Sequence, residues 1–215
     1  MKIHGYFRSS AAYRVRIALN LKNVECDTAM VNLQSGDQSS AAYRAVNPQG
    51  RVPALEVDGH TLIQSIAIME YLDETVPSPP LLPADPLARA RVRGIANIIS
   101  CDIHPLNNLA VLNYLRDDLS ADEDARVQWY QHWVRQGFDG VEPLLANSAD
   151  TGKFVHGDLP GLADICLVPQ VFNAQRFNCD LSPYPTIMRI CDECMGLDAF
   201  DRAQPSKQPE AAQLS

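Results

Sequence analysis

Two adjacent serines, preceded by Arg8, stand at a point where a predicted strand gives way to a predicted helix. Ser9 and Ser10 follow an apolar run that predicts a strand over Lys2–Phe7, and they precede an apolar-periodic segment that predicts a helix over Ser10–Lys22. Serine is a favoured N-cap residue, and the free N–H groups of a helix's first turn point outward from it. Such a turn has a partial positive charge and stabilises an anion, a thiolate included. The serines could equally be plain helix caps, and the local sequence leaves both interpretations open.

A second helix start and a proline are two further candidate binding features. Gln64 and Ser65 follow a predicted hairpin and begin the next helix, so this N-terminus could hold a carboxylate, although Ser65 would also suit a plain cap. Pro53 stands at the start of a strand, where a ladder N–H would otherwise be needed, and this position predicts a cis Val52–Pro53 peptide bond. The backbone of Val52 would then be exposed and able to pair with an extended peptide ligand.

The six cysteines are expected to be structural thiols. Cys191 and Cys194 have the spacing of a metal or redox pair, but they lie in a predicted helix without a second pair or a nearby histidine. Most of the six lie in apolar helical contexts, which in a reducing compartment favours buried thiols over disulfides. The other four are Cys26, Cys101, Cys166 and Cys179.

The composition is that of a globular protein with ample core. The chain has 215 residues, of which 46% are hydrophobic and 20% charged, enough for one large domain or two small ones. The net charge of −8 argues against nucleic acid or an anionic membrane as the main partner, although Arg8, Arg14 and Arg16 could form a local basic pocket. No apolar run approaches the ~20 residues of a membrane span, and the N-terminus lacks a signal-peptide profile. We therefore expect a cytoplasmic protein.

Residues 2–75 alternate between predicted strands and helices. Asp58-Gly59 between two short alternating segments predicts a β-hairpin. The order β-α-β followed by α-β-β-α predicts a mixed sheet and is thioredoxin-like. After the first strand and helix, the expected elements are a strand over Glu25–Val31, a helix over Gln38–Val46, strands over Ala54–Val57 and Thr61–Ile63, and a helix over Ser65–Glu74.

The second part of the chain is predicted to be helical. Residues 76–86 contain five prolines in eleven positions, a composition that cannot continue a helix or a central strand, so we expect a linker there. The predicted organisation is an α/β domain over residues 1–78 and an all-α domain over residues 87–203, followed from Gln204 by a polar tail that is expected to be loose. His104-Pro105 is expected to interrupt the first of the helices. The helices are expected at about Leu87–Asp118, Asp122–Asn147, Leu162–Phe177, Pro185–Met195 and Leu197–Arg202.

This order of domains resembles that of the cytosolic glutathione transferases. The stretch Arg8–Leu19 resembles the signature of their zeta class, which is typically Ser-Ser-Cys-x-x-Arg-Val-Arg-Ile-Ala-Leu. The matching motifs extend over residues 1–203 and are together specific to that class. The further motifs are Asn47-Pro48-Gln49, Val52-Pro53, Gln64-Ser65, Leu81-Leu82-Pro83, Asp102–Asn108, Leu162–Val171, Asn173–Phe177 and Asp180–Pro185.

The resemblance implies a maleylacetoacetate isomerase, an enzyme of tyrosine and aromatic amino acid degradation, with glutathione as cofactor. A C=C bond does not rotate thermally at useful rates. In the implied reaction the thiolate of glutathione adds to the double bond of a dicarboxylic substrate, the resulting single bond rotates, and the thiolate leaves to give fumarylacetoacetate. The resemblance also implies a homodimer.

The resemblance further implies a role for each candidate residue. Ser9 or Ser10 would stabilise the thiolate; Ser9 is the first candidate, but the sequence does not separate them. Arg8 and Arg176 would hold the substrate's carboxylates through bidentate hydrogen bonds, whereas Arg14 is expected to be a structural salt-bridge partner. The rest of glutathione would be held by Gln64 and Ser65 at its γ-glutamyl end, by Val52 beside Pro53 at its cysteinyl backbone, and by Gln38 at its glycyl end, with His104 and Asn108 as further candidates there.

Two positions depart from the family pattern. Ala11 stands at the signature cysteine, so the first turn offers no protein thiol. Gly161 replaces the Ser or Thr that usually begins a capping box before Leu162; Asp164 is still expected to accept a hydrogen bond from the Gly161 N–H, with a small loss in stability.

Three alternative functions remain open. Maleylpyruvate isomerase uses the same chemistry on a shorter diacid, and Ala110, where an arginine could clamp such a substrate, mildly favours maleylacetoacetate. A conjugating or dehalogenating glutathione transferase is the second alternative. The third is a glutathione-binding protein without activity, for which Ala11 is the supporting feature.

Overall fold

The computed structural model describes residues 1–213, and the chain divides into two compact units. The first consists of Met1–Leu81 together with Met195–Ser215, and the second of Leu82–Cys194. The division differs from the predicted one at the C-terminal end, because the segment after Cys194 groups with the α/β unit.

The first unit contains a four-stranded mixed sheet. Its strands β1 (Lys2–Gly5), β2 (Asp27–Met30), β3 (Ala54–Val57) and β4 (His60–Ile63) have the order β2-β1-β3-β4. β1 pairs in parallel with β2 and antiparallel with β3, which forms the predicted hairpin with β4. Both central residues of that turn, Asp58 and Gly59, have positive φ, as a type I′ hairpin requires. The thioredoxin-like prediction is confirmed.

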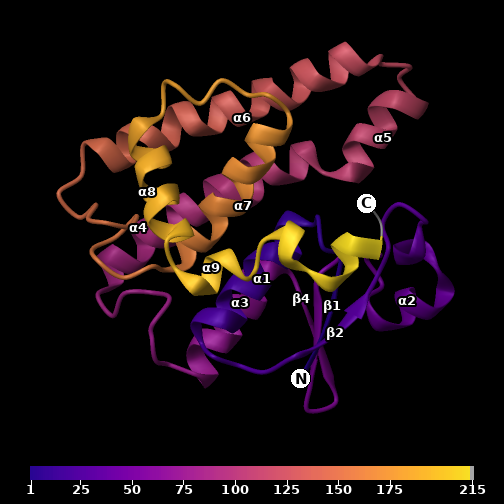
Figure 1. Ribbon diagram of the computed structural model, residues 1–215, viewed down its shortest axis with the longest axis horizontal. Coiled ribbons are helices and arrows are strands. Elements are labelled where there is room, and N and C mark those ends of the chain that lie inside the picture. Colours follow the sequence, from indigo (N-terminus) through magenta and orange to yellow (C-terminus); the bar gives the residue numbers. More distant parts are fainter. Residues whose placement is uncertain (214–215) are drawn as a thin grey trace. The chain divides into compact units, whose positions relative to one another are not determined.

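Three α-helices accompany this sheet. α1 (Ser10–Leu21) and α3 (Ser65–Thr75) lie on one side of the strands, and the short α2 (Ala41–Val46), preceded by the 3-10 turn η1 (Asp37–Ser39), lies on the other (Figure 1). The apolar positions that predict the first helix are buried in α1, because they form its core-facing stripe. The Val52–Pro53 peptide bond is cis, as predicted, and so is Ser78–Pro79.

The C-terminal segment packs against α1. It consists of α9 (Asp198–Asp201) and the 3-10 turns η4 (Pro205–Lys207) and η5 (Pro209–Gln213). Asn20 of α1 donates to the carbonyl of Ala199 at 2.9 Å, and Phe200 is fully buried. The sequence predicts a loose tail from Gln204, but the residues up to Gln213 form two turns. Local polarity does not reveal the donors on α1 that order this segment.

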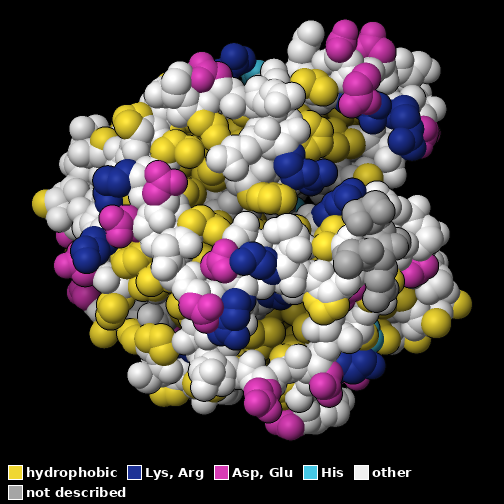
Figure 2. Space-filling view, in the orientation of Figure 1, with side chains coloured by type: hydrophobic (Ala, Val, Ile, Leu, Met, Phe, Trp, Pro, Cys, Tyr) yellow, Lys and Arg dark blue, Asp and Glu magenta, His cyan; other side chains and the backbone are white. Residues whose placement is uncertain are grey.

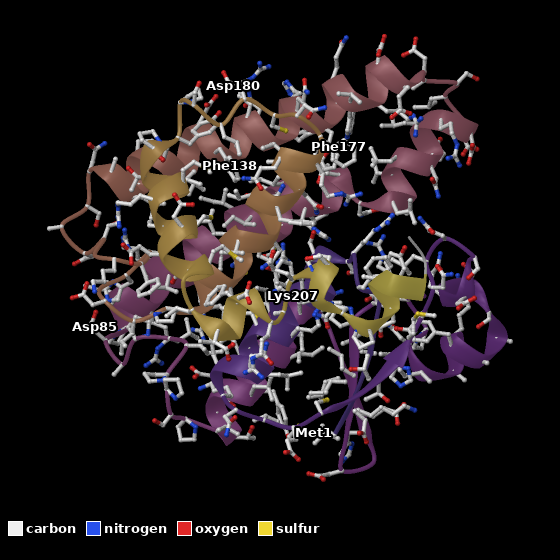
Figure 3. All side chains as sticks on the ribbon, in the orientation of Figure 1. Met1, Asp85, Phe138, Phe177, Asp180 and Lys207 are labelled. Carbon is white, nitrogen blue, oxygen red and sulfur yellow. The ribbon has the colours of Figure 1, made fainter. Side chains whose placement is uncertain are left out.

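The described residues of the second unit form helices joined by turns and loops, without a β-strand. Phe138, in the helix α6 (Glu123–Ala146), lies in the interior of the unit (Figure 3) and is edge-to-face with Tyr184 at 5.4 Å between ring centroids. The segment predicted as helical over Leu87–Asp118 is interrupted at Pro105, as expected, because proline has no backbone N–H to continue a helix, and Asn108 caps a new one. The elements are α4 (Pro86–Asn97), the π-helical η2 (Ile98–Ile103), the 3-10 turn η3 (His104–Asn107), α5 (Leu109–Asp117), α6 (Glu123–Ala146), α7 (Leu162–Arg176) and α8 (Pro185–Met195).

The capping arrangement expected before α7 is present. Asp164 accepts a hydrogen bond from the Gly161 N–H at 2.8 Å, and its other carboxylate oxygen accepts one from the Val155 N–H at 2.9 Å. Asp164 is almost fully buried, and burial raises its pKa to about 6 although both backbone donors act in the opposite direction. The carboxylate therefore holds the loop before α7 onto the start of that helix.

The surface is charged, and the cysteines are free thiols, as the sequence predicts. Charged side chains of both signs are interspersed on the face shown in Figure 2. Over residues 1–213, no helix combines the length and the apolar character needed to cross a membrane.

All six cysteines are free thiols; Cys191 and Cys194 are buried in α8, and burial raises the pKa of both. The described residues hold no group of His, Cys, Asp and Glu side chains suited to a metal ion.

Candidate functional site

The register of the sheet places several predicted residues at one edge. His4, next to the end of β1, pairs with Ala54 at the start of β3, and Ala54 pairs with Ile63 at the end of β4. The residues that follow β1 and β4 and those that precede β3 therefore leave the sheet at the same edge. These are the segments Arg8–Ser10, Arg51–Pro53 and Gln64–Ser65.

Ser9 is the N-cap of α1. Its backbone is extended, with φ −70° and ψ 121°, and its hydroxyl oxygen accepts a hydrogen bond from the Ala12 N–H at 3.2 Å. Its own N–H donates to the Tyr6 carbonyl at 2.9 Å and closes a turn. A hydroxyl has one proton to donate in addition to its acceptor sites, so Ser9 can cap the helix and still donate to an anion.

Ser10 is the first residue of α1 and is only 4% exposed, whereas Ser9 is half-buried. The two hydroxyls that the sequence cannot separate thus differ in accessibility. Ala11 follows in the same turn and is also half-buried. The geometry of the turn favours Ser9 as the hydroxyl that meets a ligand.

The start of α3 has an unusual backbone. Gln64, its N-cap residue, has φ +69° and ψ 118°, in the positive-φ region that non-glycine residues seldom adopt. Its side-chain amide donates to the Gln49 side-chain oxygen at 2.9 Å. The first N–H groups of a helix lack intrahelical acceptors, so this end of α3 can accept a carboxylate. Strained backbone of this kind is often found where a ligand binds.

Arg14 supports the start of α3 from α1. It is 2% exposed and donates to the Ser65 hydroxyl at 3.4 Å. The two helix starts that carry the serines are therefore connected by a buried guanidinium. The sequence predicts a salt bridge for Arg14; this contact with a hydroxyl is a different one, and the salt bridge stays a prediction.

The segment before β3 is held in place by hydrogen bonds to one of its backbone carbonyl groups. The Arg51 carbonyl accepts hydrogen bonds from the Tyr43 hydroxyl and from the Asn47 side-chain amide, both at 2.7 Å. Asn47 is almost fully buried. Sequence reasoning found Asn47 only through the Asn47-Pro48-Gln49 motif of the resemblance, and it missed Tyr43. Their contacts fix the backbone immediately before Val52 and Pro53.

Gln38 lies in η1 against the turn that leads to this segment. Gly50 has φ +61°, and a Cβ placed there would lie 2.8 Å from the Gln38 carbonyl oxygen, so only glycine fits this close approach. The side-chain oxygen of Gln38 is buried and accepts no hydrogen bond from the described residues. An amide with an unused acceptor suits the N–H groups of a peptide ligand.

Arg8 lies in the turn before Ser9. It is half-buried, and its guanidinium carbon lies 5.0 Å from the centroid of the Phe7 ring. Stacking on an aromatic face restricts a guanidinium without using its N–H donors. Arg8 thus offers a positioned fork for a carboxylate next to the serines.

The remaining candidates belong to the second unit. Asn108 is the N-cap of α5; its oxygen accepts from the Val111 N–H at 3.1 Å and its amide donates to the Pro105 carbonyl at 2.6 Å, so both ends of this side chain already have structural partners. His104 begins η3, directly after the π-helical segment. Arg176 ends α7, is exposed, and donates to the Asn173 side-chain oxygen at 3.1 Å.

Comparison with known proteins gives a consistent result along the whole chain. The family described as glutathione S-transferase, N-terminal domain, matches residues 1–74. Maleylacetoacetate isomerase of Pseudomonas aeruginosa is 49% identical over 213 residues, which are 98% of this chain and 98% of the relative.

Two solved structures are similar over the full length. One is the holo structure of a bacterial maleylpyruvate isomerase described as a zeta-class glutathione S-transferase, with 48% identity, a TM-score of 0.96 and coverage of 98% of this chain and 99% of that one. The other is maleylacetoacetate isomerase of Methylobacterium extorquens with bound malonate and GSH, with 41% identity, a TM-score of 0.94 and coverage of 97% and 98%.

Proposed function

Because the chain belongs to the zeta class of the glutathione S-transferases, we propose that it is a glutathione-dependent cis–trans isomerase that converts maleylacetoacetate to fumarylacetoacetate. The observation that carries the proposal is the accessible Ser9 hydroxyl at the N-terminus of α1, at the same sheet edge as two features suited to a peptide. Glutathione is the cofactor. When bound, it supplies a thiolate that adds to the substrate's double bond and leaves again.

The residues of the first unit fit this tripeptide. The start of α3 at Gln64 and Ser65 offers free N–H groups for the γ-glutamyl carboxylate. Val52, beside Pro53, offers its backbone to the cysteinyl residue, as an added strand would. The buried, unused side-chain oxygen of Gln38 supports its assignment to the N–H of the glycyl end.

Ser9 and α1 together supply enough stabilisation for the thiolate. A free thiol has a pKa near ~8.5, and lowering it by about two units takes roughly 2.7 kcal/mol. A helix N-terminus contributes ~0.3–2 kcal/mol, and a hydrogen bond to a charged acceptor ~1.5–3 kcal/mol. We assign this donor role to Ser9, because Ser10 is buried; Ser10 remains a cofactor-binding candidate through its place in the first turn.

The substrate's carboxylates are assigned to guanidinium groups. Arg8 presents its fork next to Ser9, and Arg176 is the candidate from the second unit. His104 and Asn108 remain cofactor-binding candidates from that unit, although the capping bonds of Asn108 weaken its case. Activity that is unchanged in Arg176→Ala would remove Arg176 from the assignment.

Maleylpyruvate isomerase is the second candidate function. It is favoured by the similarity to the solved maleylpyruvate isomerase, which at 48% identity is as strong as that to the Pseudomonas relative. The two activities share one mechanism and differ in the length of the diacid. Ala110, at which an arginine could clamp the shorter substrate, supports maleylacetoacetate.

One assay tests the proposal. The loss of maleylacetoacetate and of maleylpyruvate is followed spectrophotometrically with and without a catalytic amount of glutathione. We expect turnover that requires glutathione, with a higher kcat/KM for maleylacetoacetate. A higher value for maleylpyruvate would establish the second candidate. Glutathione binding without turnover of either would indicate a binding protein, and turnover without glutathione would overturn the mechanism.

The biological setting extends the same proposal. We assign the enzyme to the degradation of tyrosine and other aromatic amino acids and to a homodimer, because the zeta-class resemblance implies both, and we assign it to the cytoplasm, as expected from the sequence. Light scattering on the purified protein tests the dimer, and a mass of one chain, 23.7 kDa, would contradict it.

A further inference from the structure

Arg16 connects the turn Tyr6–Ser9, here called the catalytic turn, to the C-terminal segment. Its Nε donates to the Ala203 carbonyl at 3.0 Å, and its Nη2 donates to the Phe7 carbonyl at 3.0 Å. Phe7 immediately precedes Arg8, and Ala203 follows α9 and is 1% exposed. A single planar group thus holds two segments almost two hundred residues apart in sequence. Figure 1 shows the C-terminal segment alongside α1, and Figure 3 labels Lys207 on it.

The carbonyl that Arg16 holds belongs to the central peptide of a turn. The Ser9 N–H donates to the Tyr6 carbonyl, so Tyr6–Ser9 is a β-turn whose central peptide joins Phe7 to Arg8. Turns of type I and type II differ by the orientation of this peptide, and type II requires a positive φ at the third residue, here Arg8. Such a φ is unfavourable for arginine. Arg8 is not among the residues with positive φ, and the hydrogen bond from Arg16 to the Phe7 carbonyl further holds the peptide in this orientation.

The Arg16 guanidinium is suited to this role. Burial lowers its pKa to about 10, so it stays protonated at neutral pH, and the charge of Glu210 in η5 acts in its favour. The guanidinium carbon lies 5.3 Å from the centroid of the Tyr13 ring, which restricts it further. A planar fork with donors at fixed angles holds two carbonyls in one geometry, which a lysine ammonium does less well.

We propose that Arg16 is a positioning residue for the isomerase: by fixing the Phe7–Arg8 peptide against the C-terminal segment, it aims the Ser9 hydroxyl and the Arg8 guanidinium at their ligands. This inference rests on the proposed function. According to this inference, the residues after Arg202 contribute to catalysis although they do not contact the substrate. The reacting groups are unchanged; Arg16 acts only through the geometry of the turn.

The test compares three variants of the full chain. Arg16→Gln removes the charge and the fork, and Arg16→Lys keeps the charge with a different geometry. Asn20→Ala is the matched control, because Asn20 lies one turn further along α1 and donates to the same C-terminal segment at Ala199 but makes no bond to the catalytic turn. The readouts are the pKa of bound glutathione, from the ultraviolet absorbance of its thiolate against pH, and kcat with maleylacetoacetate.

In Arg16→Gln we expect the pKa of the bound thiol to rise by about one unit and kcat at neutral pH to fall about tenfold, the effect of one weakened hydrogen bond to a thiolate. Arg16→Lys is expected to lie between Arg16→Gln and wild type. Asn20→Ala should lower the thermal midpoint and leave both the thiol pKa and kcat unchanged.

Three results overturn the inference: a wild-type thiol pKa in Arg16→Gln, an equal shift in Asn20→Ala, or, where Arg16→Gln does not fold, a wild-type thiol pKa in Arg16→Lys. Failure of the proposed function is distinguishable, because it appears in the wild-type chain as absent glutathione binding or absent turnover.

Discussion

At the scale of single residues, the proposed function gives Ser9 two roles that use different atoms. Its oxygen accepts from the Ala12 N–H and so begins α1, and its proton is available to a thiolate. A substitution that keeps the first role and removes the second would separate structure from catalysis. Aspartate is such a residue, because its carboxylate is a good N-cap but has no proton to donate at neutral pH.

We therefore expect Ser9→Asp to fold normally and to be almost inactive. Its free energy of unfolding should stay within about 0.5 kcal/mol of wild type, since both residues cap well. Its kcat should fall at least 10- to 100-fold, because a hydrogen bond of ~1.5–3 kcal/mol to the thiolate is replaced by repulsion. Urea unfolding and steady-state kinetics measure the two quantities. Ser10→Ala is the control, with a smaller effect on kcat; a Ser9→Asp enzyme with wild-type kcat would contradict the assignment.

The sequence predicts the residue types of the candidate site, but it does not predict their hydrogen-bond partners. Serines before a helical pattern, a proline at a strand start and arginines in one motif predict where an anion could bind. The choice between Ser9 and Ser10 needed the burial of Ser10. The contacts of Arg16 with Phe7 and Ala203 join residues far apart in sequence, and no local pattern encodes that distance.

At the scale of elements, two glycines of α6 allow a direct comparison. A Cβ at Gly137 would lie 2.2 Å from side-chain carbons of Ile103, the last residue of the π-helical η2, whereas a Cβ at Gly140 meets nothing within 4 Å. Ile103 is fully buried. The close contact between α6 and η2 therefore depends on the missing side chain of Gly137.

We expect Gly137→Ala and Gly140→Ala to change stability in opposite directions. Gly137→Ala should lower the free energy of unfolding by about 1–3 kcal/mol through overpacking, while Gly140→Ala should raise it by about 0.8–1 kcal/mol through helix propensity. Urea unfolding of both variants beside wild type measures the difference. Equal changes in the free energy of unfolding of the two variants would show that the Ile103 side chain moves aside without a loss of stability.

Asp164 predicts a pH-dependent contribution to stability. Burial raises its pKa from 3.8 to about 6 in the folded chain, so the folded state binds more protons than the unfolded state between these values. The free energy of unfolding that Asp164 contributes is thus fully present below about pH 4 and is lost, by up to about 3 kcal/mol, as the pH rises through 6. Groups with lowered pKa, such as Asp180, act in the opposite direction.

Asp164→Asn isolates this contribution, because asparagine does not titrate and the other groups cancel in the comparison. Its single side-chain oxygen can serve only one of the two N–H donors of Val155 and Gly161, so we expect the variant to be less stable than wild type. The difference in unfolding free energy, measured by urea titration at several pH values, should decrease as the pH rises from about 4 to about 6. A difference that is constant or increases would contradict the raised pKa.

The element boundaries show which parts of the secondary structure the sequence pattern predicts and which it does not. Ala54–Val57 and Pro185–Met195 form as predicted, since each lies between clear turn or proline signals. The long apolar-periodic segment after Pro86 instead becomes four elements: Pro105 and the cap Asn108 end one helical stretch and begin the next, whereas no proline or cap residue marks the start of the π-helical η2. His104 follows directly, so the irregular segment sets the position of a candidate site residue.

At the scale of the whole molecule, the chain that leaves the first unit is anchored by a buried lysine. Lys22, the C-cap residue of α1, has a fully buried side chain whose Nζ donates to the Asp73 carboxylate at 2.6 Å and to the carbonyls of Val76 and Pro79 at 2.7 and 2.5 Å. Asp73 also accepts from the Leu81 N–H at 2.7 Å. The proline-rich composition of residues 76–86 predicts a linker, but its first half is held by these bonds.

Lys22→Met tests how much this anchor contributes. Methionine retains much of the apolar stem but leaves the Asp73 carboxylate and two carbonyls without their buried donor, so we expect the free energy of unfolding to fall by about 3–5 kcal/mol. Lys207→Met is the matched control, because its pair with Asp201 at 3.1 Å is largely exposed and should contribute under about 1 kcal/mol. Glutathione affinity of the folded Lys22→Met protein should be unchanged, since Lys22 lies at the opposite end of α1 from Ser9. A loss as small as that of the control would mean that water replaces the lysine at little cost.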